Sequence, residues 1–361
     1  MKMVMRWFPG GDDSVTLAQI KQIPGVTGVA TCLTDVPVGE VWPLDRLVAL
    51  KEEINKADLE VEVIESVNIH EDIKKGLPTR DRYTENYLKT MENLAAIGIK
   101  CLCYNFMPVV DWARSDLAAP LPDGSTVMSY RHEEVVKMNP AKMADVMFSQ
   151  ARGYSLPGWE PERLAAMAAD IGFYQSMTLE AYWANLRYFL AAVIPHAEEL
   201  DIKMAIHPDD PPWPLYGLPK AITDAEGIRT FLALHDSVYN GLAICTGSLG
   251  ANPDNDLPAM IREFAGQGRI HFAHIRNVKR LSPRDFDEAA HPSFCGSLDM
   301  FAIVKAFHDS GFDGYIRPDH GRMIWGEKAR PGYGLYDRAL GVTYLLGLWE
   351  AITKMKAEQK E

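Results

Sequence analysis

Two hydrophobic patterns alternate along the chain. Short runs rich in β-branched and apolar residues predict buried strands, and the stretches between them repeat apolar residues every three to four positions, which predicts amphipathic helices. The predicted strands cover 4–8, 28–33, 59–67, 99–106, 203–207, 241–245, 270–275 and 314–318. The predicted helices cover 14–23, 43–56, 84–97, 179–200, 224–235, 257–267, 298–310 and 336–355. This alternation favours an α/β fold, a (β/α)₈ TIM barrel that forms a single domain over residues 1–361.

One interval departs from the regular spacing. Residues 107–177 are rich in proline, glycine and tryptophan and contain two short helical patterns, at 140–152 and 161–174. We interpret the interval as a partly helical insertion after the fourth strand. Because it leaves from the carboxyl end of a strand, it would emerge on the face where barrel enzymes carry their active sites. We expect it to act as a lid or an oligomer contact.

Candidate metal ligands stand where the last four predicted strands end. These ends read AIHPDD, AICTGS, FAHIRN and IRPDHG, and they contain His207, Cys245, His274 and Asp319. At the mouth of a barrel the four side chains would point toward one centre. One such residue alone is more often structural, but two imidazoles, a thiolate and a carboxylate together predict a metal site. The set suits zinc, ferrous iron, cobalt or manganese, and a closed structural zinc site is the alternative to a catalytic ion.

Other side chains near the strand ends are candidates for holding an acidic, sugar-like substrate. An arginine can grip a carboxylate through two parallel hydrogen bonds, and an amide or imidazole can bind a hydroxyl. The candidates are Arg6, Trp7, His70, Asn105, Arg276, Arg317 and Arg322. By contrast, we expect Lys279, Arg280 and Arg284 to lie in a long, proline-containing loop as solvated charges.

Proton transfer requires an acid and a base near the metal. His320 directly follows the candidate ligand Asp319, and histidine titrates near neutral pH. Tyr333 lies between glycines in the sequence ARPGYG, a context typical of a mobile loop that delivers a phenol. We predict that these two residues are catalytic.

Composition narrows the class of partner. The formal net charge is −12, which disfavours nucleic acid or an anionic membrane as a partner and favours a small molecule. The five cysteines form no CxxC pair and no signal peptide is apparent, so we expect a cytoplasmic protein. No apolar run has the length of a membrane span.

Several long motifs resemble one known family. The motifs are MRWFPGGDD, ESVNIHEDIKKG, CYNFMPVVDWARSDL, MAIHPDDPPWPLYGLPK, GLAICTGSLG, IHFAHIRNV and YIRPDHGR. Together they resemble the D-mannonate dehydratases along nearly the whole chain. The resemblance implies a xylose-isomerase-like barrel that converts D-mannonate to 2-dehydro-3-deoxy-D-gluconate in hexuronate breakdown, with Mn²⁺ or Fe²⁺ as cofactor. It also implies the same four metal ligands and an acid–base pair at His320 and Tyr333, and we expect a homo-oligomer.

Three alternatives remain at this stage. A sugar isomerase or epimerase on the same barrel would also use a divalent ion, although such sites usually depend on several carboxylates. A zinc nuclease of the same barrel group is disfavoured by the acidic balance. A metal-stabilised sugar-acid binding protein without catalysis would tolerate substitution of Tyr333.

Overall fold

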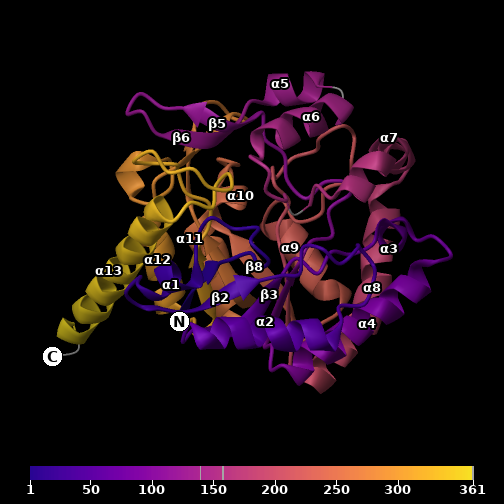
Figure 1. The fold of residues 1–361 in the computed structure, drawn as a ribbon, viewed down its shortest axis with the longest axis horizontal. Helices are drawn as coiled ribbons and strands as arrows, with labels where there is room; N and C mark the ends of the chain where they lie inside the picture. Colours follow the sequence, from indigo (N-terminus) through magenta and orange to yellow (C-terminus); the bar gives the residue numbers. More distant parts are fainter. Residues whose placement is uncertain (139, 157, 360–361) are drawn as a thin grey trace.

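The computed structural model of the protein describes residues 1–138, 140–156 and 158–359 and contains a closed parallel barrel (Figure 1). Around the barrel the strands are ordered β1-β12-β9-β8-β7-β4-β3-β2, so neighbours in the barrel follow one another along the chain. The predicted fold class is confirmed, and each of the predicted strands overlaps a barrel strand. The barrel strands are β1 (Lys2–Arg6), β2 (Val26–Thr31), β3 (Glu60–Glu65), β4 (Cys101–Tyr104), β7 (Lys203–Ile206), β8 (Asn240–Cys245), β9 (Ile270–Ile275) and β12 (Tyr315–Pro318).

Helices surround the barrel and bury their apolar faces against it. Several begin at a side chain that accepts a hydrogen bond from the first turn, among them α9 at Asp224, α11 at Asp256 and α12 at Asp299. The outer helices are α1 (Leu17–Lys21), α2 (Leu44–Lys56), α4 (Arg80–Ala96), α8 (Leu179–Leu200), α9 (Ala225–Leu234), α11 (Leu257–Gly266), α12 (Met300–Asp309) and α13 (Tyr336–Glu358). Shorter helices are α3 (Glu71–Lys75), α10 (Thr246–Gly250) and a 3₁₀ turn, η1 (Ser293–Cys295).

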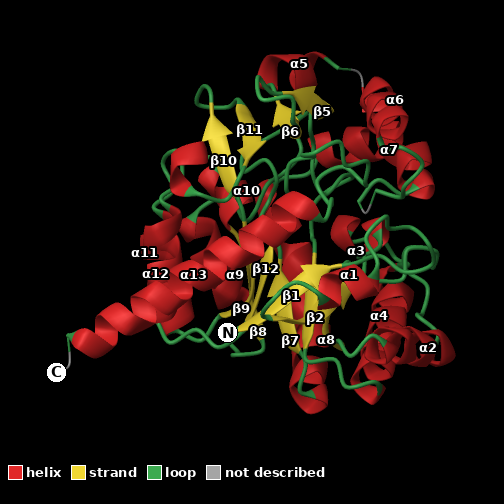
Figure 2. Cartoon of the chain, turned by 60° about the vertical axis from the view of Figure 1, so that its left-hand side comes forward, coloured by secondary structure: helices red, strands yellow, loops and turns green. Residues whose placement is uncertain are grey.

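A second sheet lies above the barrel and was not predicted (Figure 2). Its order is β10-β11-β6-β5, and neighbouring strands are antiparallel. We call it the accessory sheet. The segment after β4 contributes β5 (Asp116–Pro120) and β6 (Thr126–Tyr130), and the segment after β9 contributes β10 (Asn277–Arg280) and β11 (Phe286–Ala289).

The accessory sheet changes the description of the insertion. The two predicted helices are present as α6 (Pro140–Gln150) and α7 (Pro161–Gln175), and α5 (His132–Lys137) precedes them. The insertion is nevertheless partly β structure, because β6 pairs with β11. Arg284 lies exposed in the loop between β10 and β11, as expected. Lys279 and Arg280 instead belong to β10: Lys279 is exposed, whereas Arg280 donates a 2.8 Å hydrogen bond to the carbonyl of Gly250.

Inside the barrel, small and apolar side chains form a buried layer. Ala205, Ala243 and Phe272 belong to it, each one to three positions before a strand ends. Because side chains alternate along a strand, the residues two positions farther on point into the barrel mouth. The interior is thus filled, and the polar side chains gather at one end.

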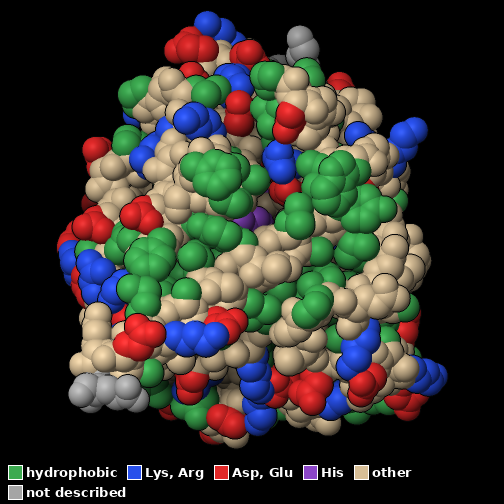
Figure 3. Space-filling model, turned by 90° about the vertical axis from the view of Figure 1, so that its left-hand side faces the viewer, with side chains coloured by type: hydrophobic (Ala, Val, Ile, Leu, Met, Phe, Trp, Pro, Cys, Tyr) green, Lys and Arg blue, Asp and Glu red, His purple; other side chains and the backbone are tan. Residues whose placement is uncertain are grey.

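The face that carries α13 differs from the rest of the surface. Figure 3 shows hydrophobic side chains in the middle of this face, with charged side chains around them. Trp325, Tyr336 and Leu340 line an open groove there and are among the exposed large hydrophobic residues. Of the helices that the structure describes, none combines the length and apolar character that crossing a membrane requires.

Candidate active site

Three of the four predicted metal ligands meet at the ends of adjacent strands. His207, Cys245 and His274 each offer one ligand atom, and these atoms all lie within 4.8 Å of one another. His207 follows β7, Cys245 ends β8, and His274 lies on β9. Strand register explains the convergence, because Cys245 and His274 are paired across β8 and β9.

The fourth predicted ligand, Asp319, lies beside this cluster. It follows β12, and its Oδ2 is 3.4 Å from Sγ of Cys245. Arg317 places Nη1 2.7 Å from Oδ1 of the same carboxylate. Burial opposes ionisation of Asp319, but His320 and Arg317 hold its pKa well below the usual range. The cluster therefore contains a fixed anion.

These residues fit a divalent cation. Nδ1 of His207 lies 2.7 Å from the carbonyl oxygen of Pro208, so a proton on Nδ1 leaves Nε2 free to ligate. Nε2 of His274 is buried and has no hydrogen-bond partner among the described residues. Burial raises the pKa of Cys245 to about 12, and a bound cation would stabilise the thiolate instead.

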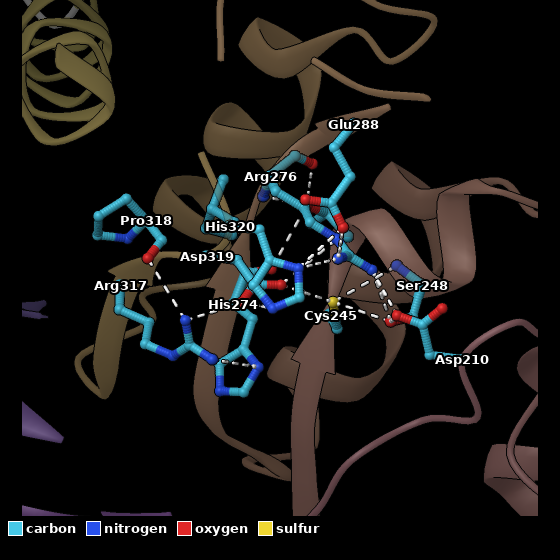
Figure 4. Close-up of polar contacts among 12 residues, drawn as sticks. Asp210, Cys245, Ser248, His274, Arg276, Glu288, Arg317, Pro318, Asp319 and His320 are labelled. Atoms are coloured by element: carbon cyan, nitrogen blue, oxygen red, sulfur yellow. Dashed lines mark hydrogen bonds and ion pairs between the residues drawn. The ribbon is translucent and has the colours of Figure 1, made fainter. Parts of the chain in front are cut away.

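A glycine two positions after Cys245 lets an arginine approach the site. A Cβ atom on Gly247 would lie 1.8 Å from Nε of Arg276, so any larger residue would collide with this side chain. Arg276 donates to Oδ2 of Asp210 at 2.7 Å and to Oε1 of Glu288 at 2.7 Å (Figure 4). Its guanidinium is thus bound by two carboxylates and is not free to grip a substrate.

An open cavity of about 710 Å³ adjoins the cluster. It contains His207 and Asp319, whereas Cys245 and His274 are fully buried and are not among its lining residues. The insertion contributes part of its wall. The other predicted site residues that line it are Arg6, Asn105, Arg317, His320 and Tyr333, and the insertion residues are Asp111, Trp112, Met128 and Leu156.

The predicted acid–base pair is in contact. The hydroxyl of Tyr333 lies 3.1 Å from Nε2 of His320, and the rings meet edge to face. Burial raises the pKa of Tyr333 to about 12, so the phenol is protonated at neutral pH. The pair can therefore hold a proton between an imidazole and a phenol at the wall of the cavity.

Three predicted substrate-binding residues are not brought to this cavity. Trp7 is buried and follows Arg6, whose side chain does line the cavity. His70 caps α3, where its Nδ1 accepts from the backbone of Asp72, and its ring stacks on Tyr83 at 3.6 Å. These placements are corrections, since a residue adjacent to a strand end, or several residues beyond it, has no reason to share the inward direction.

Arg322 is the third correction. Its Nη2 donates to Oδ1 of Asp337 at 2.9 Å, and its Nη1 donates to Oδ2 of Asp123 at 3.1 Å. Arg322 therefore ties the loop after β12 to α13 and to the turn between β5 and β6. Arg322 is not among the residues that line the cavity.

Several buried acids of the site were missed by the sequence reasoning. Glu65 ends β3, lines the cavity and pairs with Nη2 of Arg317 at 2.9 Å. Asp210 lies three positions after His207, so its place in HPDD was an available signal. The sequence held no signal for Glu288, because its position depends on the accessory sheet.

Comparison with known proteins agrees with this geometry. A sequence model of the D-mannonate dehydratase family matches residues 1–359. A mannonate dehydratase of Thermotoga neapolitana is 59% identical over 356 residues, which is 99% of either chain. The crystal structure of mannonate dehydratase from Streptococcus suis serotype 2 is similar, with a TM-score of 0.89 and 46% identity, over 99% of this chain and 96% of that one.

A more distant structure shares the fold alone. The xylose isomerase domain protein from Planctomyces limnophilus has a TM-score of 0.57 at 12% identity, over 98% of both chains. The family match and the identity to the Thermotoga protein both extend over nearly the full length. The chain therefore belongs to the D-mannonate dehydratase family, a family of hydro-lyases.

Proposed function

We propose that this chain converts D-mannonate to 2-dehydro-3-deoxy-D-gluconate and water, as a step in hexuronate breakdown. The observation that carries the proposal is the contact between the ligand cluster and the acid–base pair. His207, Cys245 and His274 converge within 4.8 Å, and Asp319 joins this cluster to His320, its neighbour in sequence. Membership of the family supports the same reaction.

We propose Mn²⁺ or Fe²⁺ as the cofactor. His207, Cys245, His274 and Asp319 would hold the ion. When bound, the ion would supply positive charge to the substrate carboxylate and the adjoining hydroxyl, where negative charge develops as the neighbouring proton leaves. The mixed donor set of imidazole, thiolate and carboxylate is compatible with both metals.

The chain's own residues provide the proton transfers. Dehydration removes a proton from the carbon beside the carboxylate and adds a proton to the hydroxyl that leaves from the next carbon. His320 and Tyr333 are the pair for these two steps, one as base and the other as acid. The resulting enol then takes up a proton on carbon, loses the proton of its hydroxyl group and becomes the keto acid. Arg6 and Asn105 line the cavity and would donate hydrogen bonds to substrate oxygens.

The insertion is proposed to act as a lid. Trp112, Met128 and Leu156 come from it and line the cavity, so a movement of this segment would open or close the site. Exclusion of water would strengthen the electrostatic interactions with the substrate.

The other partners expected from the sequence remain proposals. The groove of Trp325, Tyr336 and Leu340 supports a homo-oligomer, since large exposed apolar patches commonly mark protein contacts. The net charge of −12 supports a sugar acid as a small-molecule partner, with no role for nucleic acid or membrane, in the cytoplasm.

The test is an assay on protein purified without oxygen and supplied with Mn²⁺ or Fe²⁺. A panel of aldonic acids is incubated with the enzyme, and 2-keto-3-deoxy acid is detected by its thiobarbiturate colour. The proposal expects colour with D-mannonate and none without metal. Ketose formation in place of the keto-deoxy acid would favour the isomerase alternative. Turnover of a different aldonic acid alone would refute the substrate while leaving the metal site in place.

A further inference from the structure

Glu288 reaches the acid–base pair from outside the barrel. It lies on β11 of the accessory sheet and is 2% exposed. Its Oε1 lies 2.8 Å from Nδ1 of His320, on the side of the ring opposite to Nε2 (Figure 4). The same ring therefore contacts Glu288 through one nitrogen and Tyr333 through the other.

Two buried arginines hold this carboxylate in place. Arg114 donates to Oε1 of Glu288 at 2.9 Å, and Arg276 donates to the same oxygen at 2.7 Å. Both arginines are also bound by Asp210, at 2.8 Å and 2.7 Å. Charge-assisted hydrogen bonds of this kind fix both the position and the ionised state of a carboxylate.

The carboxylate of Glu288 favours one tautomer of the neutral imidazole of His320. A neutral histidine has one N–H, and an ionised carboxylate can only accept a hydrogen bond. A proton on Nδ1 of His320 can be donated to Glu288, whereas a lone pair there would face the anion at 2.8 Å. With the proton on Nδ1, the lone pair of Nε2 faces the hydroxyl of Tyr333.

A contact with Arg276 favours the other tautomer, in which the proton is on Nε2 of His320. Its Nη1 lies 2.7 Å from Nδ1 of His320 and could donate to a lone pair on that nitrogen. However, Nη1 already has Glu288 as an acceptor, and Nη2 has Asp210 and the hydroxyl of Ser248. Arg276 therefore has acceptors without the imidazole, whereas a lone pair on Nδ1 would lie 2.8 Å from the anionic Oε1 of Glu288.

We propose that Glu288 is a positioning residue that keeps His320 as the Nδ1–H tautomer, so that Nε2 is the proton acceptor at the wall of the cavity. The inference rests on the proposed function for its consequence in catalysis. The tautomer of His320 is inferred from the contacts alone and does not depend on the proposed function. The accessory sheet thereby takes part in the chemistry of the barrel mouth.

The tautomer can be observed directly in the unmodified protein. Full-length protein with ¹⁵N-labelled histidine is studied by two-bond ¹H–¹⁵N correlation at a pH where the imidazole is neutral, first without added metal and then with diamagnetic Zn²⁺. A His320→Gln sample assigns the signals. We expect the protonated-type nitrogen of His320 to be Nδ1 in both samples. A proton on Nε2 in both, as donation by Arg276 requires, would overturn the proposal; a proton on Nε2 in only one would overturn it for that state.

Variants then test the consequence for catalysis. The amide of Gln can donate to Nδ1 and so favours a proton on Nε2, and we expect Glu288→Gln to lower kcat by about 100-fold with KM changed by less than about threefold. Glu288→Asp keeps the anion and should recover at least about tenfold of that loss. Asp287→Asn is the matched control, since this neighbour on β11 contacts Ser129 and Arg131 and should leave kcat within about threefold.

The outcomes separate this inference from the proposed function. If the wild-type protein does not turn over D-mannonate, the proposed function fails, and the tautomer measurement still decides the inference. If the wild type is active and Glu288→Gln retains its kcat within threefold, the inference is wrong and the function stands. A loss of kcat that comes with an equal loss of bound metal or of folded protein would also contradict a positioning role.

Discussion

The hydroxyl oxygen of Tyr333 lies 3.1 Å from Nε2 of His320, where both side chains line the same cavity. Removing this hydroxyl should stop a proton transfer without removing the ring that shapes the site. We expect Tyr333→Phe to lower kcat by about 10² to 10⁴-fold with KM nearly unchanged. Steady-state kinetics with D-mannonate measure both quantities.

A second tyrosine provides the control for that substitution. Tyr336 is 42% exposed and begins α13, three residues after Tyr333. Tyr336→Phe should keep kcat within about twofold, because surface substitutions rarely disturb a distant site. Retention of full activity by Tyr333→Phe would refute a catalytic role and would fit a protein that only binds sugar acids.

The ligand cluster predicts metal binding that depends on the thiol and the imidazole. Cys245→Ser and His207→Ala should each lose bound Mn²⁺ on dialysis, whereas Cys295→Ser, a change at a half-buried cysteine of η1, should retain it. Addition of Mn²⁺ at 100 times its dissociation constant should stabilise the wild type by about 2.7 kcal/mol. Metal analysis and thermal unfolding measure the two effects. Equal metal content in all four proteins would contradict the assigned ligands.

A buried ion pair joins two segments of the insertion, and its arginine also reaches α3, where Nη2 of Arg163 lies 3.5 Å from Oε1 of Glu71. Arg163 of α7 places Nη2 3.0 Å from Oδ1 of Asp111, whose Oδ2 also accepts from Asn105. Burial opposes ionisation of Asp111, yet Arg163 and Lys74 lower its pKa to about 2. Arg163→Met would leave a buried carboxylate without its guanidinium and should cost about 3–5 kcal/mol in the free energy of unfolding.

The contrast is an exposed pair of the same chemical type. Arg229 donates to Glu263 at 2.6 Å on the surface, and Arg229→Met should change the unfolding free energy far less. Urea unfolding measures both variants, and limited proteolysis shows whether the loss is local to the insertion. Similar small losses in the two variants would mean that the insertion does not depend on its ion pair.

A buried histidine on β9 predicts a loss of stability in mild acid. Burial lowers the pKa of His271 to about 3 from an ordinary 6.5, and Lys203 and Arg269 act in the same direction. Below pH 6.5 His271 is protonated in the unfolded chain but stays neutral in the folded chain, so the free energy of unfolding falls as pH drops toward 3. At pH 5 this amounts to about 2 kcal/mol relative to pH 8.

The measurement compares His271→Gln with the wild type in urea at both pH values. Other titrating groups are common to the two proteins, so their contributions cancel in the comparison. The wild type should lose about 2 kcal/mol more than the variant between pH 8 and pH 5. Parallel pH profiles would show that this imidazole is not the group responsible.

The barrel could be predicted from the sequence because its strands are buried runs at regular intervals. The accessory sheet could not, since β10 and β11 are four residues long and their order depends on pairing with a distant segment. Phe286 of β11 pairs with Tyr130 of β6, which is far away in sequence. Hydrophobic periodicity carries no information about such a pairing.

The metal ligands of the site could be predicted from the sequence, but the orientation of the polar residues around them could not. His207, Cys245, His274 and Asp319 were found because a parallel barrel brings all its strand ends to one place. Local sequence did not tell which of the neighbouring polar residues turn inward. Arg276 was expected to bind substrate, but it is bound between Asp210 and Glu288, and the second of these acids is supplied by the unpredicted sheet.

The shared sheet also limits how this chain can be shortened. Deleting 107–177 would remove β5 and β6, and β6 is the strand with which β11 pairs. A trimmed barrel could still present all its strand-end donors, yet the segment carrying Glu288 would have lost its scaffold. The smallest unit that preserves the whole active site is thus the barrel together with the insertion after β4 and the segment after β9. Moving either segment into a related barrel would therefore require moving the other as well.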